Sequence, residues 1–147
     1  MKIGIGADHR GYNLKNFIKE HTKIDGTTLD WVDYGAFTAD RSDYPLFAQS
    51  LVQAIKAHEI EVGVLLCGYG TGMAMAANRF KGIYAAVAWD PLVARAARED
   101  DNMNVIVLPA DILNQQQALD IIKASLEATF KGGRYAQRLS MVDKFGH

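Results

Sequence analysis

The sequence is poor in three features, and each shortage excludes a class of protein. Its 147 residues contain one cysteine, Cys67, which excludes an intramolecular disulfide framework and a zinc site built from several cysteines. Its 16 Lys and Arg residues are balanced by 17 Asp and Glu, whereas nucleic-acid-binding domains usually have a basic excess. No apolar run approaches the ~20 residues of a membrane span. We therefore expect neither nucleic acid nor membrane among its partners.

The N-terminal segment and the overall composition also lack special features. Residues 1–8 become polar too soon for a signal peptide, so we expect a cytoplasmic protein, in which a free thiol stays reduced. The length corresponds to one domain, and no segment has the Gly/Ser-rich composition of a linker. The hydrophobic fraction of 49% is ordinary for a globular protein. We expect a single domain over residues 1–147.

Short apolar runs alternate with segments of helical spacing along the chain. The runs are residues 3–7, 28–32, 62–67, 83–89 and 105–108. This alternation predicts βαβ units, and so an α/β, Rossmann-like domain with one doubly wound, five-stranded parallel sheet covered by helices on both faces. We expect the strand order 2-1-3-4-5. A last helix, about 134–145, follows Gly132-Gly133 and is expected to pack on a partner subunit, although its own domain is an alternative.

Ligands of such sheets bind at the carboxyl ends of the strands, near the point where the strand order reverses. In this order the reversal lies between the first and third strands. The first strand ends in Asp8-His9, and the third ends in Cys67, followed by the glycine-rich loop Gly68–Gly72. We therefore expect these residues to meet in one crevice.

The loop Gly68-Tyr69-Gly70-Thr71-Gly72 is expected to open a helix. Alternate glycines allow several N–H groups to point at one place, which favours an anion. The dinucleotide fingerprint fails, because Met73 or Met75 stands where the last Gly or Ala is needed, and no P-loop motif is present. The loop is thus predicted to hold a small anion or a developing negative charge, the alternative being a structural turn.

Cys67, His9 and Asp8 each have a structural alternative. A lone cysteine at the end of a buried strand is often an apolar filler, but a neighbouring glycine loop at a helix start favours a reactive thiolate, as nucleophile or general base. His9 could satisfy a backbone group, and Asp8 could cap the next helix. Their shared place at a strand end favours contact with a ligand.

Several motifs recur in the order of one known family. They are Gly6-Ala7-Asp8-His9-Arg10-Gly11, Ser42-Asp43-Tyr44-Pro45, Cys67-Gly68-x-Gly70-x-Gly72-Met73 with Ala76-Ala77-Asn78, and Gly132-Gly133-Arg134 with Arg138. Together they resemble type B ribose-5-phosphate isomerase, whose family also includes the galactose-6-phosphate isomerase subunits. The resemblance spans nearly the whole chain.

The resemblance implies an aldose–ketose isomerase of carbohydrate metabolism that uses no metal and no cofactor. It implies a homodimer or a dimer of dimers with active sites shared between subunits, so that the C-terminal arginines serve the neighbour's crevice. The reaction would pass through a cis-enediolate, with Cys67 transferring the proton and the N–H groups near Thr71 and Gly72 forming the oxyanion hole. The remaining implied contacts with the sugar phosphate are those of Asp8, His9, Tyr44, Gly68, Tyr69, Gly70, Asp101, Asn102, Arg134 and Arg138.

Three departures from the family pattern affect the predicted site. Asp100 and Asp101 stand where the family has His-Asn, and that His helps to open the sugar ring. Tyr69 replaces a Thr or Ser, and Asp111 replaces an Arg that contacts phosphate. Either Asp100 itself is the acid–base of ring opening, which we expect, or the preferred substrate needs no ring opening.

The sequence thus predicts interconversion of ribose 5-phosphate and ribulose 5-phosphate, with Cys67 as general base and Asp100 as a catalytic residue. One alternative is an isomerase of another sugar phosphate or open-chain sugar acid, for example a four-carbon sugar phosphate. Another is a non-catalytic sugar-phosphate-binding module, which would need no reactive thiol.

Overall fold

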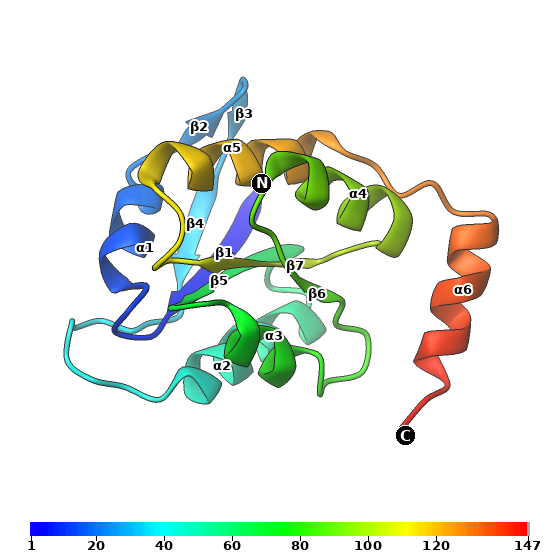
Figure 1. The fold of residues 1–147 in the computed structure, drawn as a ribbon, viewed down its shortest axis with the longest axis horizontal. Helices are drawn as coiled ribbons and strands as arrows, with labels where there is room; N and C mark the ends of the chain where they lie inside the picture. The colour runs from blue at the N-terminus through cyan, green and yellow to red at the C-terminus, as the bar shows by residue number, and fades with distance from the viewer. Residues whose placement is uncertain (147) are drawn as a thin grey trace.

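A computed structural model describes residues 1–146, which form one five-stranded parallel sheet flanked by helices (Figure 1). The sheet strands are β1 (Lys2–Ala7), β4 (Asp30–Asp33), β5 (Val62–Cys67), β6 (Ala85–Val87) and β7 (Val105–Pro109). The helices are α1 (Tyr12–Lys19), α2 (Tyr44–Lys56), α3 (Thr71–Ala77), α4 (Pro91–Asp101), α5 (Gln115–Glu127) and α6 (Arg134–Asp143). The predicted fold class, a doubly wound parallel sheet, is confirmed.

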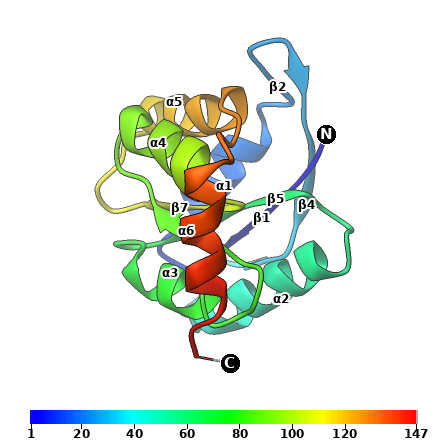
Figure 2. The same ribbon diagram turned by 90° about the vertical axis from the view of Figure 1, so that its right-hand side faces the viewer.

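The helices divide between the two faces of the sheet. Helices α1, α4 and α5 cover one face and α2 and α3 the other, and each face has its own apolar cluster (Figures 1 and 2). Right-handed crossovers explain the division, because a connection that reverses its direction across the sheet must pass over the opposite face. The chain reverses direction after β4 and again after β6.

The observed strand order, β4-β1-β5-β7-β6, corrects the predicted order at one edge. The reversal point between β1 and β5 lies where it was expected. The last two strands are exchanged, however, because β7 lies inside the sheet and β6 forms its edge. Strand β7 is buried along its whole length, whereas β6 has three residues, all half-buried, which suits an edge.

The region before β4 also differs from the prediction. The apolar run at residues 28–32 was expected to be one strand, but β4 begins only at Asp30. The preceding residues form a small antiparallel hairpin of β2 (Lys23–Ile24) and β3 (Thr27–Thr28). Its two-residue turn, Asp25-Gly26, has positive φ at both positions. An Asp-Gly pair is the usual sequence signal for such a turn, and it could have revealed the hairpin.

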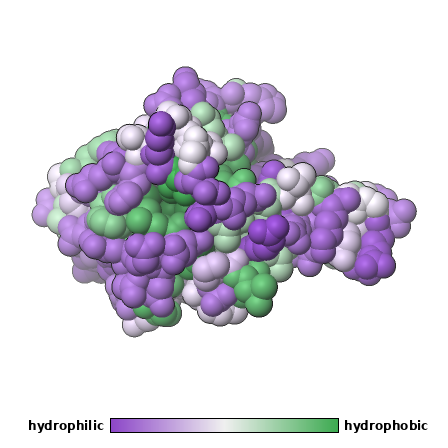
Figure 3. All heavy atoms as spheres, turned by 90° about the horizontal axis from the view of Figure 1, so that it is seen from above, coloured by the Kyte–Doolittle hydropathy of each residue, from purple (hydrophilic) through white to green (hydrophobic). Residues whose placement is uncertain are grey.

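Helix α6 projects from the body of the domain (Figures 1 and 3). None of its residues is buried, and Met141, Val142 and the following Phe145 expose apolar side chains. Its attachment to the domain includes a hydrogen bond of 2.7 Å from the Tyr84 hydroxyl to Asp143. Burial, together with this bond to a carboxylate, raises the pKa of Tyr84 to about 12. Within residues 1–146, no helix has the length and apolar character needed to span a bilayer.

Candidate active site

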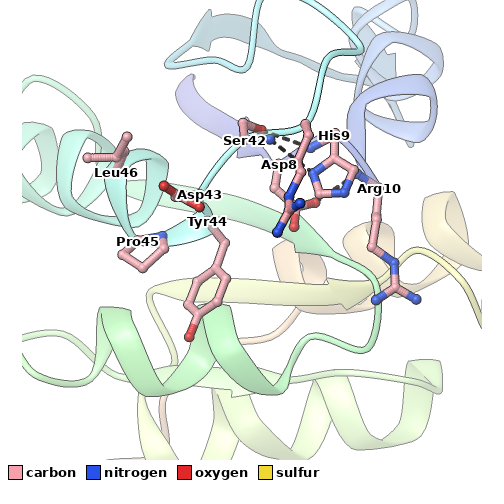
Figure 4. Close-up of a pocket in the computed structure, with 9 residues that line it drawn as sticks. Asp8, His9, Arg10, Ser42, Asp43, Tyr44, Pro45 and Leu46 are labelled. Carbon is pink, nitrogen blue, oxygen red and sulfur yellow. Dashed lines mark hydrogen bonds between the residues drawn. The ribbon is translucent and has the colours of Figure 1, made fainter.

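Two adjoining cavities lie at the carboxyl ends of β1 and β5. The larger, about 700 Å³, is lined by Asp8–Arg10 and Arg41–Leu46 (Figure 4). The smaller, about 350 Å³, is lined by Cys67 and the glycine-rich loop. Asp8, Arg10 and Tyr44 line both cavities, so the two form one crevice. This is the crevice expected at the reversal point of the sheet.

Asp8 organises the turn that leads from β1 into α1. Its carboxylate is buried, and Oδ1 accepts hydrogen bonds from the N–H groups of Arg10 at 3.0 Å and Gly11 at 3.2 Å. The N-cap of α1 is Gly11 and no side chain caps it, so Asp8 orders the turn before the helix and does not take the capping role that the sequence offered as the structural alternative. The bonds fix the direction in which the next residues, His9 and Arg10, leave the strand.

His9 is held by a reciprocal pair of hydrogen bonds with Ser42 (Figure 4). The His9 N–H donates to Ser42 Oγ at 3.1 Å, and the Ser42 N–H donates to His9 Nδ1 at 3.2 Å. Because a backbone N–H can only donate, Nδ1 is the acceptor, and the proton of a neutral ring lies on Nε2. The ring therefore has a defined donor, Nε2–H. Ser42 was quoted in a motif but given no role by sequence reasoning.

Cys67 ends β5 at the base of the smaller cavity, and only 6% of its surface is exposed. The loop after it turns at Gly70, whose φ of +79° is favourable only for glycine. A side chain at Gly72 would collide with the Tyr44 ring, which lies 2.8 Å from the ideal Cβ position. Tyr44 therefore packs directly on the loop backbone. The N–H groups of Thr71 and Gly72 lie in the first turn of α3, where they have no partner within the helix.

Arg10 occupies a position in this crevice that sequence reasoning did not assign. Its guanidinium forms an ion pair with Asp111 and stacks on the Tyr69 ring, 4.8 Å from the ring centroid. An unpaired acid at the end of the last strand would weaken anion binding by charge repulsion. Asp111 instead pairs with an arginine, and this pairing joins residues 101 positions apart. In the sequence, only the position of Arg10 directly after His9 indicated that Arg10 would reach the crevice.

The other predicted residues lie elsewhere in the chain. Asp100, Asp101 and Asn102 end α4, which runs back from the carboxyl end of β6 to the amino end of β7. Cys67, by contrast, is paired with Pro109 at the carboxyl end of β7. These three residues therefore lie toward the amino ends of the strands, whereas the crevice lies at the carboxyl ends. Arg134 and Arg138 lie on α6, which packs next to α4, and Arg134 is near enough to Asp100 for their charges to interact (Figure 1).

A cluster of charges surrounds Tyr135 on α6. Lys131, Arg134 and Arg138 each place a cation 5.0 to 5.5 Å from the ring centroid. The hydrogen bond from Arg134, together with the charges of Lys131 and Arg134, lowers the pKa of Tyr135. The arginines four residues apart thus share one helix face, as their spacing predicts.

Asp100 is paired within its own chain. Lys131 Nζ donates to Asp100 Oδ1 at 3.0 Å, and this bond raises the pKa of Lys131. The pairing ties the end of α4 to the segment before α6 and leaves the Asp100 side chain partly exposed at the surface. Asn102 accepts a hydrogen bond from Arg98 at 2.9 Å. Lys131 was not singled out by the sequence.

Asp33, at the end of β4, supports the crevice without lining it. Its carboxylate pairs with buried Lys15 at 3.0 Å and with Lys19 at 2.6 Å. Burial alone would raise the pKa of Asp33, but hydrogen bonds from Lys19, the Gly35 N–H and Lys15 outweigh it and lower the pKa. Lys15 also donates to the Ala36 carbonyl. The Gly35 carbonyl in turn accepts from the Ala7 N–H at 2.7 Å, beside Asp8.

Comparison with known proteins identifies the family. Residues 3–142 match the ribose/galactose isomerase family. The chain belongs to this family. It is an aldose–ketose sugar-phosphate isomerase, as the order of its motifs indicated.

Three relatives show how far the family likeness extends. Ribose-5-phosphate isomerase B of Escherichia coli (strain K12) is 35% identical over 96% of this chain and 93% of its own. D-erythrulose-4-phosphate isomerase of Pectobacterium atrosepticum is 37% identical over 100% of this chain and 96% of its own. The crystal structure of ribose-5-phosphate isomerase B from Mycoplasma genitalium with bound ribulose-5-phosphate is 35% identical, with a TM-score of 0.89, and covers 98% and 95% of the two chains. The substrates named for these members differ in carbon number.

Proposed function

We propose that this isomerase interconverts ribose 5-phosphate and ribulose 5-phosphate through a cis-enediolate, with Cys67 as the general base. The observation that supports this most is the position of Cys67. The thiol ends the strand at the base of the crevice, beside the glycine-rich loop and in the cavity next to His9. A solved relative with bound ribulose-5-phosphate supports the five-carbon substrate.

The proton transfers follow from the chemistry of an aldose next to a thiolate. The Cys67 thiolate removes the proton from C2, and the electrons of that bond move to the C1 carbonyl, giving the enediolate. The O2 hydroxyl then passes its proton to O1, C2 becomes the ketone, and C1 takes a proton from the Cys67 thiol. The N–H groups of Thr71 and Gly72 stabilise the developing oxyanion, each by about 3 kcal/mol if they act like other oxyanion-hole donors.

Two subunits complete each site in this proposal. His9 Nε2–H binds the phosphate from one subunit, and Arg134 and Arg138 of a second subunit bind it from α6, in a homodimer or a dimer of dimers. Asp8, Tyr44 and the loop residues Gly68, Tyr69 and Gly70 contact or order the sugar. The position of α6, which stands apart from the body of the domain, supports this sharing (Figure 1). Asp100, Asp101 and Asn102 lie next to α6 and would enter the same neighbouring site.

Asp100 is proposed to open the furanose ring. Ribose 5-phosphate closes its ring through O4, so the hemiacetal must open before C2 can lose its proton. Asp100, beside Lys131, can accept the proton of the anomeric hydroxyl as the C1–O4 bond breaks and C1 becomes the aldehyde. The same carboxyl group or the Lys131 ammonium then gives a proton to O4, which completes the opening. Arg134 lies close enough to Asp100 for their charges to interact, which keeps this carboxylate beside the proposed phosphate-binding group.

A four-carbon sugar phosphate is the second candidate substrate. Its O4 bears the phosphate, so no furanose ring can form and no ring-opening residue is needed. The Lys131–Asp100 ion pair is compatible with this candidate, because the pairing gives Asp100 a structural role that requires no ring opening. The relative named D-erythrulose-4-phosphate isomerase also supports it.

A panel of phosphorylated sugars with four, five and six carbons decides between the candidates through kcat/KM. We expect Asp100→Ala to lower kcat/KM for ribose 5-phosphate by about 10²-fold, the lower end of general acid–base contributions, and to leave a four-carbon substrate unaffected. Asp120→Ala removes an equal charge at an exposed position of α5 and is the control. Unchanged turnover of ribose 5-phosphate by Asp100→Ala would exclude Asp100 from ring opening. A four-carbon optimum in the unmodified protein would select the second candidate.

A further inference from the structure

We propose that Arg10 binds the substrate phosphate together with His9, and that Asp111 and Tyr69 position its guanidinium. The inference rests on the proposed function only for the identity of the substrate. The proposed function gives no role to Arg10 or Asp111, and it gives Tyr69 only a general contact with the sugar.

Arg10 lies at the junction of the two cavities. Its side chain extends away from the neighbouring His9 ring, with Tyr44 on the other side of the crevice (Figure 4). It also packs on the loop: a Cβ built on Gly68 would lie 2.3 Å from Arg10 Cζ and 2.5 Å from Nε. The guanidinium therefore lies flat against the backbone of the residue that follows Cys67. A ligand that reaches from His9 to Cys67 must pass it.

The guanidinium is held before any ligand binds. Gly68 covers one part of it, the Tyr69 ring lies 4.8 Å away, and Asp111 pairs with Nη2. An arginine that is already ordered loses less side-chain freedom on binding than a mobile one. Asp111 and Tyr69 are therefore positioning residues, because they act through Arg10.

Arg10 keeps donors available while it is held. A guanidinium has five N–H donors, and the hydrogen bonds within residues 1–146 use only Nη2, toward Asp111. The side chain is 41% exposed, so the free donors reach the crevice. A phosphate accepts two parallel N–H bonds from such a planar fork. His9 Nε2–H, from the adjacent residue, supplies a further donor to the same anion.

The competing explanation is that Arg10 only neutralises Asp111, a carboxylate that would otherwise repel a phosphorylated sugar. The double variant Arg10→Ala/Asp111→Ala separates the two explanations, because it removes one charge of each sign and keeps the net charge. If Arg10 contacts phosphate, the double variant binds as weakly as Arg10→Ala alone or nearly so. If Arg10 only neutralises Asp111, the double variant regains the affinity of the unmodified protein.

Calorimetric titration with inorganic phosphate and with ribose 5-phosphate provides the test. Inorganic phosphate is not turned over, whereas ribose 5-phosphate gives the apparent affinity for the mixture of aldose and ketose that an active enzyme forms. We expect Arg10→Ala to weaken both ligands by about 10- to 100-fold, the usual range for a lost charged hydrogen bond. We expect kcat, measured separately, to change much less than KM. The matched control is Lys123→Ala/Glu127→Ala, which removes an exposed ion pair on α5.

Each outcome has one meaning. Recovery in the double variant, or weaker sugar binding with unchanged phosphate binding, would overturn the proposed phosphate contact. Unchanged affinities in Arg10→Ala would overturn the inference altogether. Weakened binding in Arg10→Ala would support it even if the unmodified protein proved unable to isomerise ribose 5-phosphate, a result that would contradict only the proposed function.

Discussion

Replacing Cys67 by alanine is expected to lower kcat for sugar-phosphate isomerisation by at least about 10³-fold, within the range that a positioned acid–base group supplies. The thiol ends β5 and lines the smaller cavity, where it is buried beside the glycine-rich loop. Substrate affinity should stay within a few-fold, because the proposed phosphate contacts are on other residues. Steady-state kinetics and calorimetric binding measure the two quantities separately.

Cys67→Ser is the matched variant, since it keeps the size of the side chain but replaces the thiol by a much weaker acid. It should be nearly as inactive as Cys67→Ala, with a circular dichroism spectrum like that of the unmodified protein. A Cys67→Ala enzyme that turns over within about tenfold of the unmodified rate would show that another group moves the proton.

Mixing two inactive variants is expected to restore activity. Cys67→Ala lacks the base, whereas Arg134→Ala/Arg138→Ala lacks the proposed phosphate contacts on α6. In a mixed dimer, one site would combine the intact crevice of one subunit with the intact α6 of the other. After random exchange of equal amounts, about a quarter of all sites would be complete, because half of the dimers are mixed and each has one such site.

The reason for this expectation is geometric. The crevice opens at the carboxyl ends of the strands, whereas Arg134 and Arg138 lie on a helix that projects beside the end of α4 (Figures 1 and 2). The mixture is compared with each variant alone after the same unfolding and refolding treatment. If the mixture stays inactive although mixed dimers form, or if the arginine variant alone keeps full activity, the sites are not shared in this way.

The fold was predictable because buried parallel strands leave a clear sequence signal. Uninterrupted apolar runs such as residues 62–67 and 105–108 marked the central strands, and Asp8-His9 and Cys67 followed from the strand ends. The order of β6 and β7 did not follow, because both strands can be reached by crossovers of the correct hand. Burial distinguishes them only once the sheet is known: β7 is buried throughout and β6 is not.

The charged pairs of the site could not be predicted from the sequence. Arg10 and Asp111 are 101 residues apart, and Lys131 and Asp100 are 31 apart. No local pattern links such residues, because their proximity results from the packing of strand ends and helix ends. Both acids looked unfavourable for binding a phosphorylated sugar, and in the structure each is paired with a cation from a distant segment.

The central claim, proton transfer by Cys67 through an enediolate, is tested most directly by isomerisation in D2O followed by NMR. A thiol exchanges its proton with solvent, so deuterium should appear at C1 of the ribulose 5-phosphate formed and at C2 of the recovered ribose 5-phosphate. Cys67→Ala should introduce no deuterium at either carbon. Ketose that forms without any solvent deuterium would indicate direct hydride transfer between the carbons and would contradict the account.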